Sequence, residues 1–133
     1  MPPPVKPTVA LIAHDRMKPA LLDFVRTHQA VLGKFNLVAT ASTGQLLNEQ
    51  LGLRTECVIH GPEGGDLIIG GRVALGQIRA VIFLRDPLTA QPHEPDVSAL
   101  MRVCDVHSVP LATNLGTASA VMDDLRDEVP TSS

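Results

Sequence analysis

Five short apolar runs recur along this chain, and each run ends directly in a cluster of small polar residues. The runs cover residues 9–13, 37–39, 57–59, 80–84 and 109–112. They are continuous rather than alternating, which is typical of strands that are buried on both faces. Segments with helical periodicity lie between them. This alternation predicts a single doubly wound α/β domain, with a five-stranded, mainly parallel sheet and helices on both faces.

Four of the intervening segments place apolar residues at the spacing of one helix face. They predict helices over about 19–32, from about 43 to Gly52, from Pro95 onward, and from a cap at Asn114 or Thr117 onward. A helix from Asp66 to Gly76 is a weaker prediction, because Gly70 and Gly71 interrupt it. The α/β domain is expected to span residues 8–128, with a flexible arm at 1–7 and a frayed tail at 129–133.

Composition narrows the classes of partner. The 133 residues carry a formal net charge of −3 and contain no Trp or Tyr, which argues against nucleic-acid binding. No apolar run approaches the ~18 residues that would span a bilayer. Cys57 and Cys104 fall inside a predicted strand and a predicted helix, so both are expected to be buried free thiols. Free thiols are typical of a reducing cytoplasm, which is the predicted location.

The polar clusters indicate where a ligand would bind. If the runs are parallel strands, all five clusters meet at one edge of the sheet, and open parallel sheets bind ligands in the crevice at that edge. The clusters contain hydroxyls, a lysine, glycines, histidines and carboxylates. These are groups suited to a small phosphorylated molecule.

A hydroxyl-rich turn, Thr40-Ala41-Ser42-Thr43-Gly44, lies where a predicted strand passes into a helix. Hydroxyls and backbone N–H groups at a helix N-terminus bind anions, and the helix dipole adds to this. Capping alone would need one hydroxyl, and three are present, which favours a phosphate site. Lys18, one turn into the first predicted helix, could supply the positive charge.

Two further segments combine carboxylates with glycine or histidine. Asp66 follows the glycine-rich segment 61–65 at the start of a predicted helix, where it is either an N-cap or a catalytic carboxylate. The loop 86–96 contains three prolines and places carboxylates around His93. Such a histidine is either a proton shuttle or a surface residue in a rigid turn. The chain has no close His-x-His or Cys-x-x-Cys pair, so a metal site built from His14, His60 and His93 with a carboxylate is not expected.

Together these segments resemble the methylglyoxal synthase family, over about residues 9–122. The resemblance implies a lyase that converts dihydroxyacetone phosphate to methylglyoxal and inorganic phosphate. It also implies a homohexamer that needs no metal or organic cofactor. Inorganic phosphate is expected to inhibit, because a site for the substrate's phosphate also recognises the free product. The segments that carry it are Ala13-His14-Asp15 with Lys18, Gly61-Pro62-x-Gly64-Gly65-Asp66, Asp86-Pro87-Leu88-x-Ala90-x-Pro92-His93-x-Pro95-Asp96, and Pro110-x-Ala112-Thr113-Asn114.

The resemblance also implies a role for each site residue. Asp66 matches the base that removes a proton next to the carbonyl, and His93 matches the histidine that moves protons between the substrate oxygens. Asp15 and Asp96 match supporting carboxylates, and His14 matches a histidine that contacts the substrate. The phosphate-binding positions are Lys18, Thr40, Ser42, Thr43 and Gly61, with His60 beside them in place of the family's usual serine.

The chain departs from the family pattern most clearly at Leu67-Ile68, where the family usually has two glutamines. The alternative function is a regulatory ligand-binding module, because the same fold occurs as the allosteric domain of carbamoyl phosphate synthetase. Such a module would need the anion-binding turn, but it would not need both Asp66 and His93.

Overall fold

The computed structural model describes residues 7–59, 63–89 and 94–128. Their five strands form one sheet in the order β3-β2-β1-β4-β5, and each neighbouring pair is parallel. The strands are β1 (Thr8–Ala13), β2 (Asn36–Thr40), β3 (Glu56–Val58), β4 (Ile78–Leu84) and β5 (Leu111–Ala112). The predicted doubly wound α/β fold is therefore confirmed.

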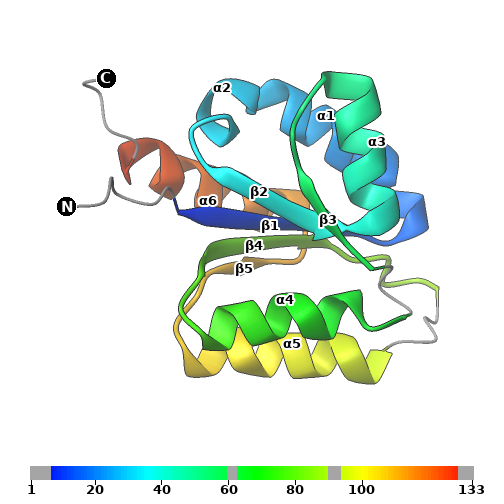
Figure 1. Cartoon of the computed structure of the whole chain (residues 1–133), viewed down its shortest axis with the longest axis vertical. Helices are drawn as coiled ribbons and strands as arrows, with labels where there is room; N and C mark the ends of the chain where they lie inside the picture. Colours follow the sequence, from blue (N-terminus) through cyan, green and yellow to red (C-terminus); the bar gives the residue numbers. More distant parts are fainter. Residues whose placement is uncertain (1–6, 60–62, 90–93, 129–133) are drawn as a thin grey trace.

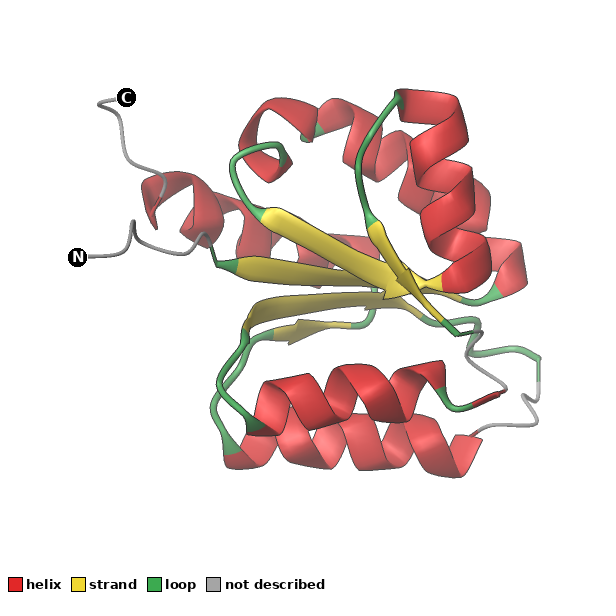
Figure 2. Cartoon of the chain, in the orientation of Figure 1, coloured by secondary structure: helices red, strands yellow, loops and turns green. Residues whose placement is uncertain are grey.

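Helices cover both faces of this sheet (Figure 1, Figure 2). One face carries α1, α2, α3 and α6, and the other carries α4 and α5. The helical elements are η1 (Asp15–Met17), α1 (Lys18–Thr27), α2 (Gln29–Leu32), α3 (Ala41–Leu51), α4 (Gly65–Ala74), α5 (Glu94–Val106) and α6 (Leu115–Glu128).

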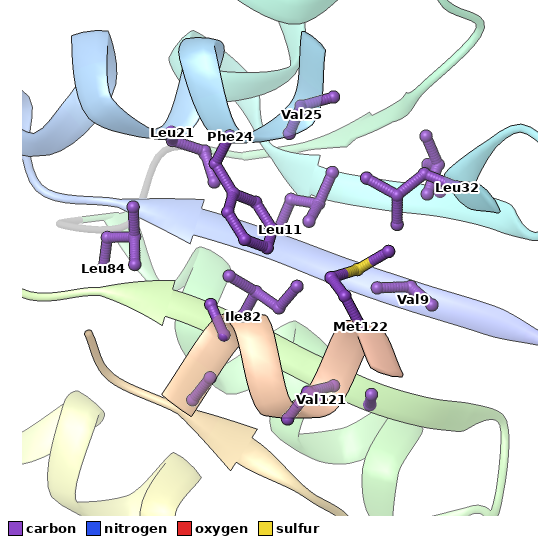
Figure 3. Packing of buried hydrophobic residues seen from close by; sticks show 14 of the residues in the cluster. Val9, Leu11, Leu21, Phe24, Val25, Leu32, Ile82, Leu84, Val121 and Met122 are labelled. Carbon is purple, nitrogen blue, oxygen red and sulfur yellow. The ribbon is translucent and has the colours of Figure 1, made fainter. Parts of the chain in front are cut away.

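The core has two halves, one on each side of the sheet. On β1, Val9 and Leu11 pack toward α1 and α6, while Ala10 and Ile12 pack toward α4 and α5. Figure 3 shows side chains of α1 and α6 converging on those of β1 and β4. Each large apolar side chain buried in this way contributes about 1.5–3 kcal/mol. Burial on both faces explains why the strands read as continuous apolar runs.

The single helix predicted over residues 19–32 is two helices, α1 and α2. His28 separates them with φ −107° and ψ 19°. Its N–H donates to the carbonyl oxygens of both Phe24 and Val25, at 3.1 and 3.2 Å, which is common where an α-helix ends. Leu32, four residues after His28 and on the same apolar stripe as Leu21 and Val25, is fully buried in the core.

The glycine pair does not prevent α4 from forming. Gly70 faces α5, where a Cβ would make an ordinary van der Waals contact, 3.7 Å from Leu100 Cδ1. Gly71 is exposed, and a Cβ there would meet nothing within 4 Å. Packing against α5 therefore outweighs the low helix propensity of glycine.

One burial prediction was wrong. Cys104 is buried in α5 as expected, but Cys57 is exposed. It lies on β3, an edge strand of the sheet, and an edge strand is covered less completely than the central ones. The strand pattern did not reveal this edge position. Most of the predicted arm and the whole predicted tail, residues 1–6 and 129–133, lie outside the described residues.

Candidate active site

The parallel order brings the polar clusters to the same edge of the sheet. All five strands run toward that edge, on the right in Figure 1. The strand order reverses between β1 and β4, since β1 continues to β2 on one side and β4 continues to β5 on the other. Such a switch point is where doubly wound sheets bind their ligands. His14 follows β1 and Arg85-Asp86 follow β4, so these residues flank it.

His14 is held tightly at this point and is only 5% exposed. Its Nδ1 accepts the backbone N–H of Asp86 at 2.8 Å, and its ring lies edge-on to Phe83, with 5.1 Å between ring centroids. A ring nitrogen that accepts a hydrogen bond carries no proton. Neutral His14 therefore has its proton on Nε2, and it can donate a hydrogen bond from that atom.

The hydroxyl-rich turn forms the N-terminus of α3. Thr40 is the N-cap residue, but its side chain makes no capping hydrogen bond. Its Oγ1 instead lies 3.5 Å from Oγ1 of Thr43, and both threonines are buried. Ser42 is half-buried in the first helical turn. Because capping does not occupy the Thr40 hydroxyl, the arrangement favours anion binding, to which the first N–H groups of α3 would add.

Lys18 is the first residue of α1 and lies one turn after β1. Its ammonium group forms an ion pair with Asp15, the first residue of η1. The Lys18 side chain is 17% exposed, whereas that of Asp15 is 97% exposed. Asp15 thus reaches into solvent and holds the end of a largely covered lysine. An incoming phosphate would compete with Asp15 for that positive charge.

Asp66 and Asp96 lie at matching positions on two packed helices. Asp66 is fully buried in the first turn of α4, and Asp96 is half-buried in the first turn of α5. Gly70 packs against Leu100, and each of these residues is four positions after one of the aspartates. Both helices return from the same edge of a parallel sheet, so they run in the same direction. The two carboxylates therefore lie at the same height along the helix axes. Both are about one helical turn closer to the helix N-termini than the Gly70–Leu100 contact.

The N-cap of α4 is Gly64, with φ +104°, rather than Asp66. The capping interpretation of Asp66 is therefore wrong. A φ in this range is strained for any residue with a Cβ, which explains a glycine at this position. The first turn of a helix favours negative charge, so the position suits a carboxylate.

The structure also bears on the other predicted positions. Leu67 and Ile68 are 49% and 38% exposed, whereas Asp66 beside them is fully buried. His60, Gly61 and His93 lie outside the described residues. Asp86 also lies at this edge of the sheet, and its position directly after a buried strand and before a proline is the sequence signal for it.

The described ranges contain no group of three or more His, Cys, Asp or Glu side chains that could hold a metal ion. Within those same ranges, no helix has the length and apolar character needed to cross a membrane.

Comparison with known proteins places this arrangement in a family. A family model described as an MGS-like domain matches residues 20–113. A methylglyoxal synthase of Thermus thermophilus is 55% identical over 122 residues, which cover 92% of this chain and 97% of the relative. The chain belongs to the methylglyoxal synthase family.

Two further comparisons agree with that assignment. A methylglyoxal synthase of Clostridium botulinum is 53% identical over 114 residues, covering 86% of this chain and 96% of the relative. The crystal structure of methylglyoxal synthase from Elizabethkingia anophelis superposes with a TM-score of 0.83 at 44% identity, covering 88% of this chain and 77% of that one. The family is thus supported both by sequence and by the described fold.

Proposed function

We propose that this chain converts dihydroxyacetone phosphate to methylglyoxal and inorganic phosphate, with Asp66 as the base. Membership of the methylglyoxal synthase family supports the reaction. The observation that carries the assignment of the base is the position of Asp66, a fully buried carboxylate in the first turn of α4. Such a carboxylate is sheltered from water and is next to the positive end of a helix dipole.

The first step is removal of a proton from the hydroxyl-bearing carbon next to the carbonyl. Asp66 takes this proton, and the substrate becomes an enediolate. The negative charge that develops on its oxygen needs donors that are already in place. His14 is suited to this task because its proton is on Nε2 and its ring is held by Asp86 and Phe83. By the family resemblance, His93 moves a proton between the two substrate oxygens.

The second step is loss of phosphate from the carbon on the other side of the carbonyl. The carbon–oxygen bond to phosphate breaks when it overlaps the π system of the enediolate, so the phosphate must be held out of the enediolate plane. Thr40, Ser42 and Thr43, together with Lys18, are proposed to hold it there, and orientation of this kind decides between competing reactions. The enol that remains takes up a proton at its terminal carbon and loses its hydroxyl proton, which gives methylglyoxal.

A direct assay tests the proposed reaction. Purified protein is incubated with dihydroxyacetone phosphate in the presence of a chelator, and methylglyoxal and phosphate are both measured. We expect the two products in equal amounts. Folded protein that releases no phosphate would contradict the proposal and favour the regulatory module. Formation of glyceraldehyde 3-phosphate instead would mean that the phosphate is held in the enediolate plane.

Three finer features are proposed with this function. The protein is expected to be a homohexamer, which light scattering of the purified chain would measure. Inorganic phosphate is expected to inhibit, because a site for the substrate's phosphate also binds the free product. Sigmoidal kinetics in phosphate would indicate coupled subunits. The cytoplasmic location inferred from Cys57 and Cys104 stays a prediction.

A further inference from the structure

The end of the ladder between β1 and β4 contains an exchange of hydrogen-bond partners. The N–H of His14 donates to the carbonyl oxygen of Leu84 at 3.2 Å, which continues the parallel ladder by one rung. In that pattern the N–H of Asp86 would next donate to the main-chain oxygen of His14. That oxygen instead accepts the N–H of Met17 at 2.8 Å, because the chain has turned into η1. The ring of His14 therefore replaces the main-chain oxygen of His14 as the acceptor: its Nδ1 accepts the Asp86 N–H at 2.8 Å.

The side chain of Asp86 shapes the turn that aims this N–H. Its Oδ1 accepts the N–H of Leu88 at 3.1 Å, and Pro87 restricts the backbone between them. A hydrogen bond from the Thr89 hydroxyl, more than the one from Leu88, lowers the pKa of Asp86 below its ordinary value. The group is therefore an ionised carboxylate at neutral pH and only accepts hydrogen bonds. These contacts close residues 86–89 into one local turn.

The start of this segment, at Arg85, is also held by a hydrogen bond on the side of β5. The N–H of Arg85 donates to the carbonyl oxygen of Thr113 at 3.3 Å, beyond the end of β5. The peptide group that carries the Asp86 N–H is thus held on both sides. The hydrogen bond from Arg85 to Thr113 precedes it, and the turn closed by the Asp86 carboxylate follows it. Asp86 itself is buried.

We infer that Asp86 is a positioning residue for His14: its turn aims a backbone N–H at Nδ1, which keeps the ring in the tautomer that donates from Nε2. The other tautomer would set a proton on Nδ1 against the N–H of Asp86, donor facing donor. A ring in that form would offer an acceptor, rather than a donor, to the substrate's carbonyl oxygen. The catalytic consequence rests on the proposed function, whereas the tautomer does not.

Nuclear magnetic resonance of nitrogen-labelled histidine, without substrate, tests the inference directly. The two ring nitrogens of a neutral histidine have distinct chemical shifts according to which one carries the proton, and a His14→Gln spectrum identifies the His14 signals. We expect the parent protein to hold its His14 proton on Nε2. A proton on Nδ1 in the parent would overturn the inference, whether or not the protein is active.

Variants then test the part played by Asp86. Asp86→Ala should give a mixture of His14 tautomers and lower kcat/KM for dihydroxyacetone phosphate by about tenfold or more, since small misplacements of catalytic groups have large effects on rate. Asp86→Asn keeps an oxygen that can accept the Leu88 N–H, so it should restore the Nε2 tautomer. Asp23→Ala, an exposed carboxylate on α1, is the matched control and should change neither quantity.

Thr89→Ala covers the case in which Asp86→Ala does not fold, because Thr89 is exposed and its hydroxyl contributes to the same turn. It should shift the tautomers in the same direction by a smaller amount. If folded Asp86→Ala and Thr89→Ala both keep the parent tautomer and activity, Asp86 does not position His14. A parent with the Nε2 tautomer but no lyase activity would refute the proposed function and leave the inference about the ring intact.

Discussion

Replacing Asp66 with asparagine exchanges one oxygen for a nitrogen and removes an ionisable carboxyl group from a fully buried position. If Asp66 is the base, kcat should fall by roughly 10²–10⁴-fold. That range corresponds to about 2.7–5.4 kcal/mol of lost transition-state stabilisation, at about 1.36 kcal/mol for each tenfold change. The substrate's phosphate contacts are left in place, so phosphate should still bind.

The same change should not destabilise the fold. An ionised carboxylate is costly to bury, and an asparagine amide keeps one acceptor oxygen while it carries no charge. A neutral amide of the same size is therefore expected to keep the melting temperature or raise it. Loss of activity at unchanged or increased stability separates a catalytic group from a structural one.

The assay combines initial rates of phosphate release with thermal unfolding followed by circular dichroism. Asp23→Asn is the matched control, because Asp23 is exposed and pairs with Arg26 at 2.8 Å on the outer side of α1; its activity should equal that of the parent. An Asp66→Asn protein that keeps more than about a tenth of the parent kcat, against the range for a general base, would refute the reasoning, and Asp96 would become the next candidate. A parallel fall in melting temperature would point to a structural role instead.

Three further predictions concern the phosphate turn, α4 and the thiols. Ser42→Ala should raise the phosphate inhibition constant about tenfold, as expected for one lost hydrogen bond to a charged group; unchanged inhibition would remove Ser42 from the site. Gly71→Ala should raise the free energy of unfolding in urea by about 0.5–1 kcal/mol, because its Cβ would meet nothing within 4 Å; a decrease would contradict this. A thiol reagent should modify one cysteine of the native protein and two after unfolding, since Cys57 is exposed and burial raises the pKa of Cys104 to about 11. Two rapidly reacting thiols in the native state would contradict that assignment.

Much of the fold could be predicted because its strands are buried on both faces. β1 and β4 read as unbroken apolar runs, and the predicted runs at 9–13 and 80–84 lie within Thr8–Ala13 and Ile78–Leu84. The helix boundaries were less accurate. α3 begins at Ala41 rather than near Thr43, because the strand passes directly into the helix at Thr40. At the start of α6, Asn114 is the cap, since its Oδ1 accepts the N–H of Thr117 at 3.0 Å.

Local patterns by themselves determined the fold class and the types of polar group at the sheet edge. Apolar periodicity is a property of neighbouring residues, and it reports which face of each element is covered. The runs and the polar clusters that follow them can therefore be identified from the sequence alone.

Relations between distant segments were decided only by the tertiary structure. The hydrogen bond from Asp86 to His14 joins residues 72 positions apart, and it exists because β1 and β4 are neighbours in the sheet. Asp66 and Asp96 lie at the same height along the two helices because Gly70 of α4 packs beside Leu100 of α5. Cys57 is exposed because β3 lies at an edge of the sheet. Strand order and helix contacts depend on how the crossovers pack together, and no window of neighbouring residues contains that information.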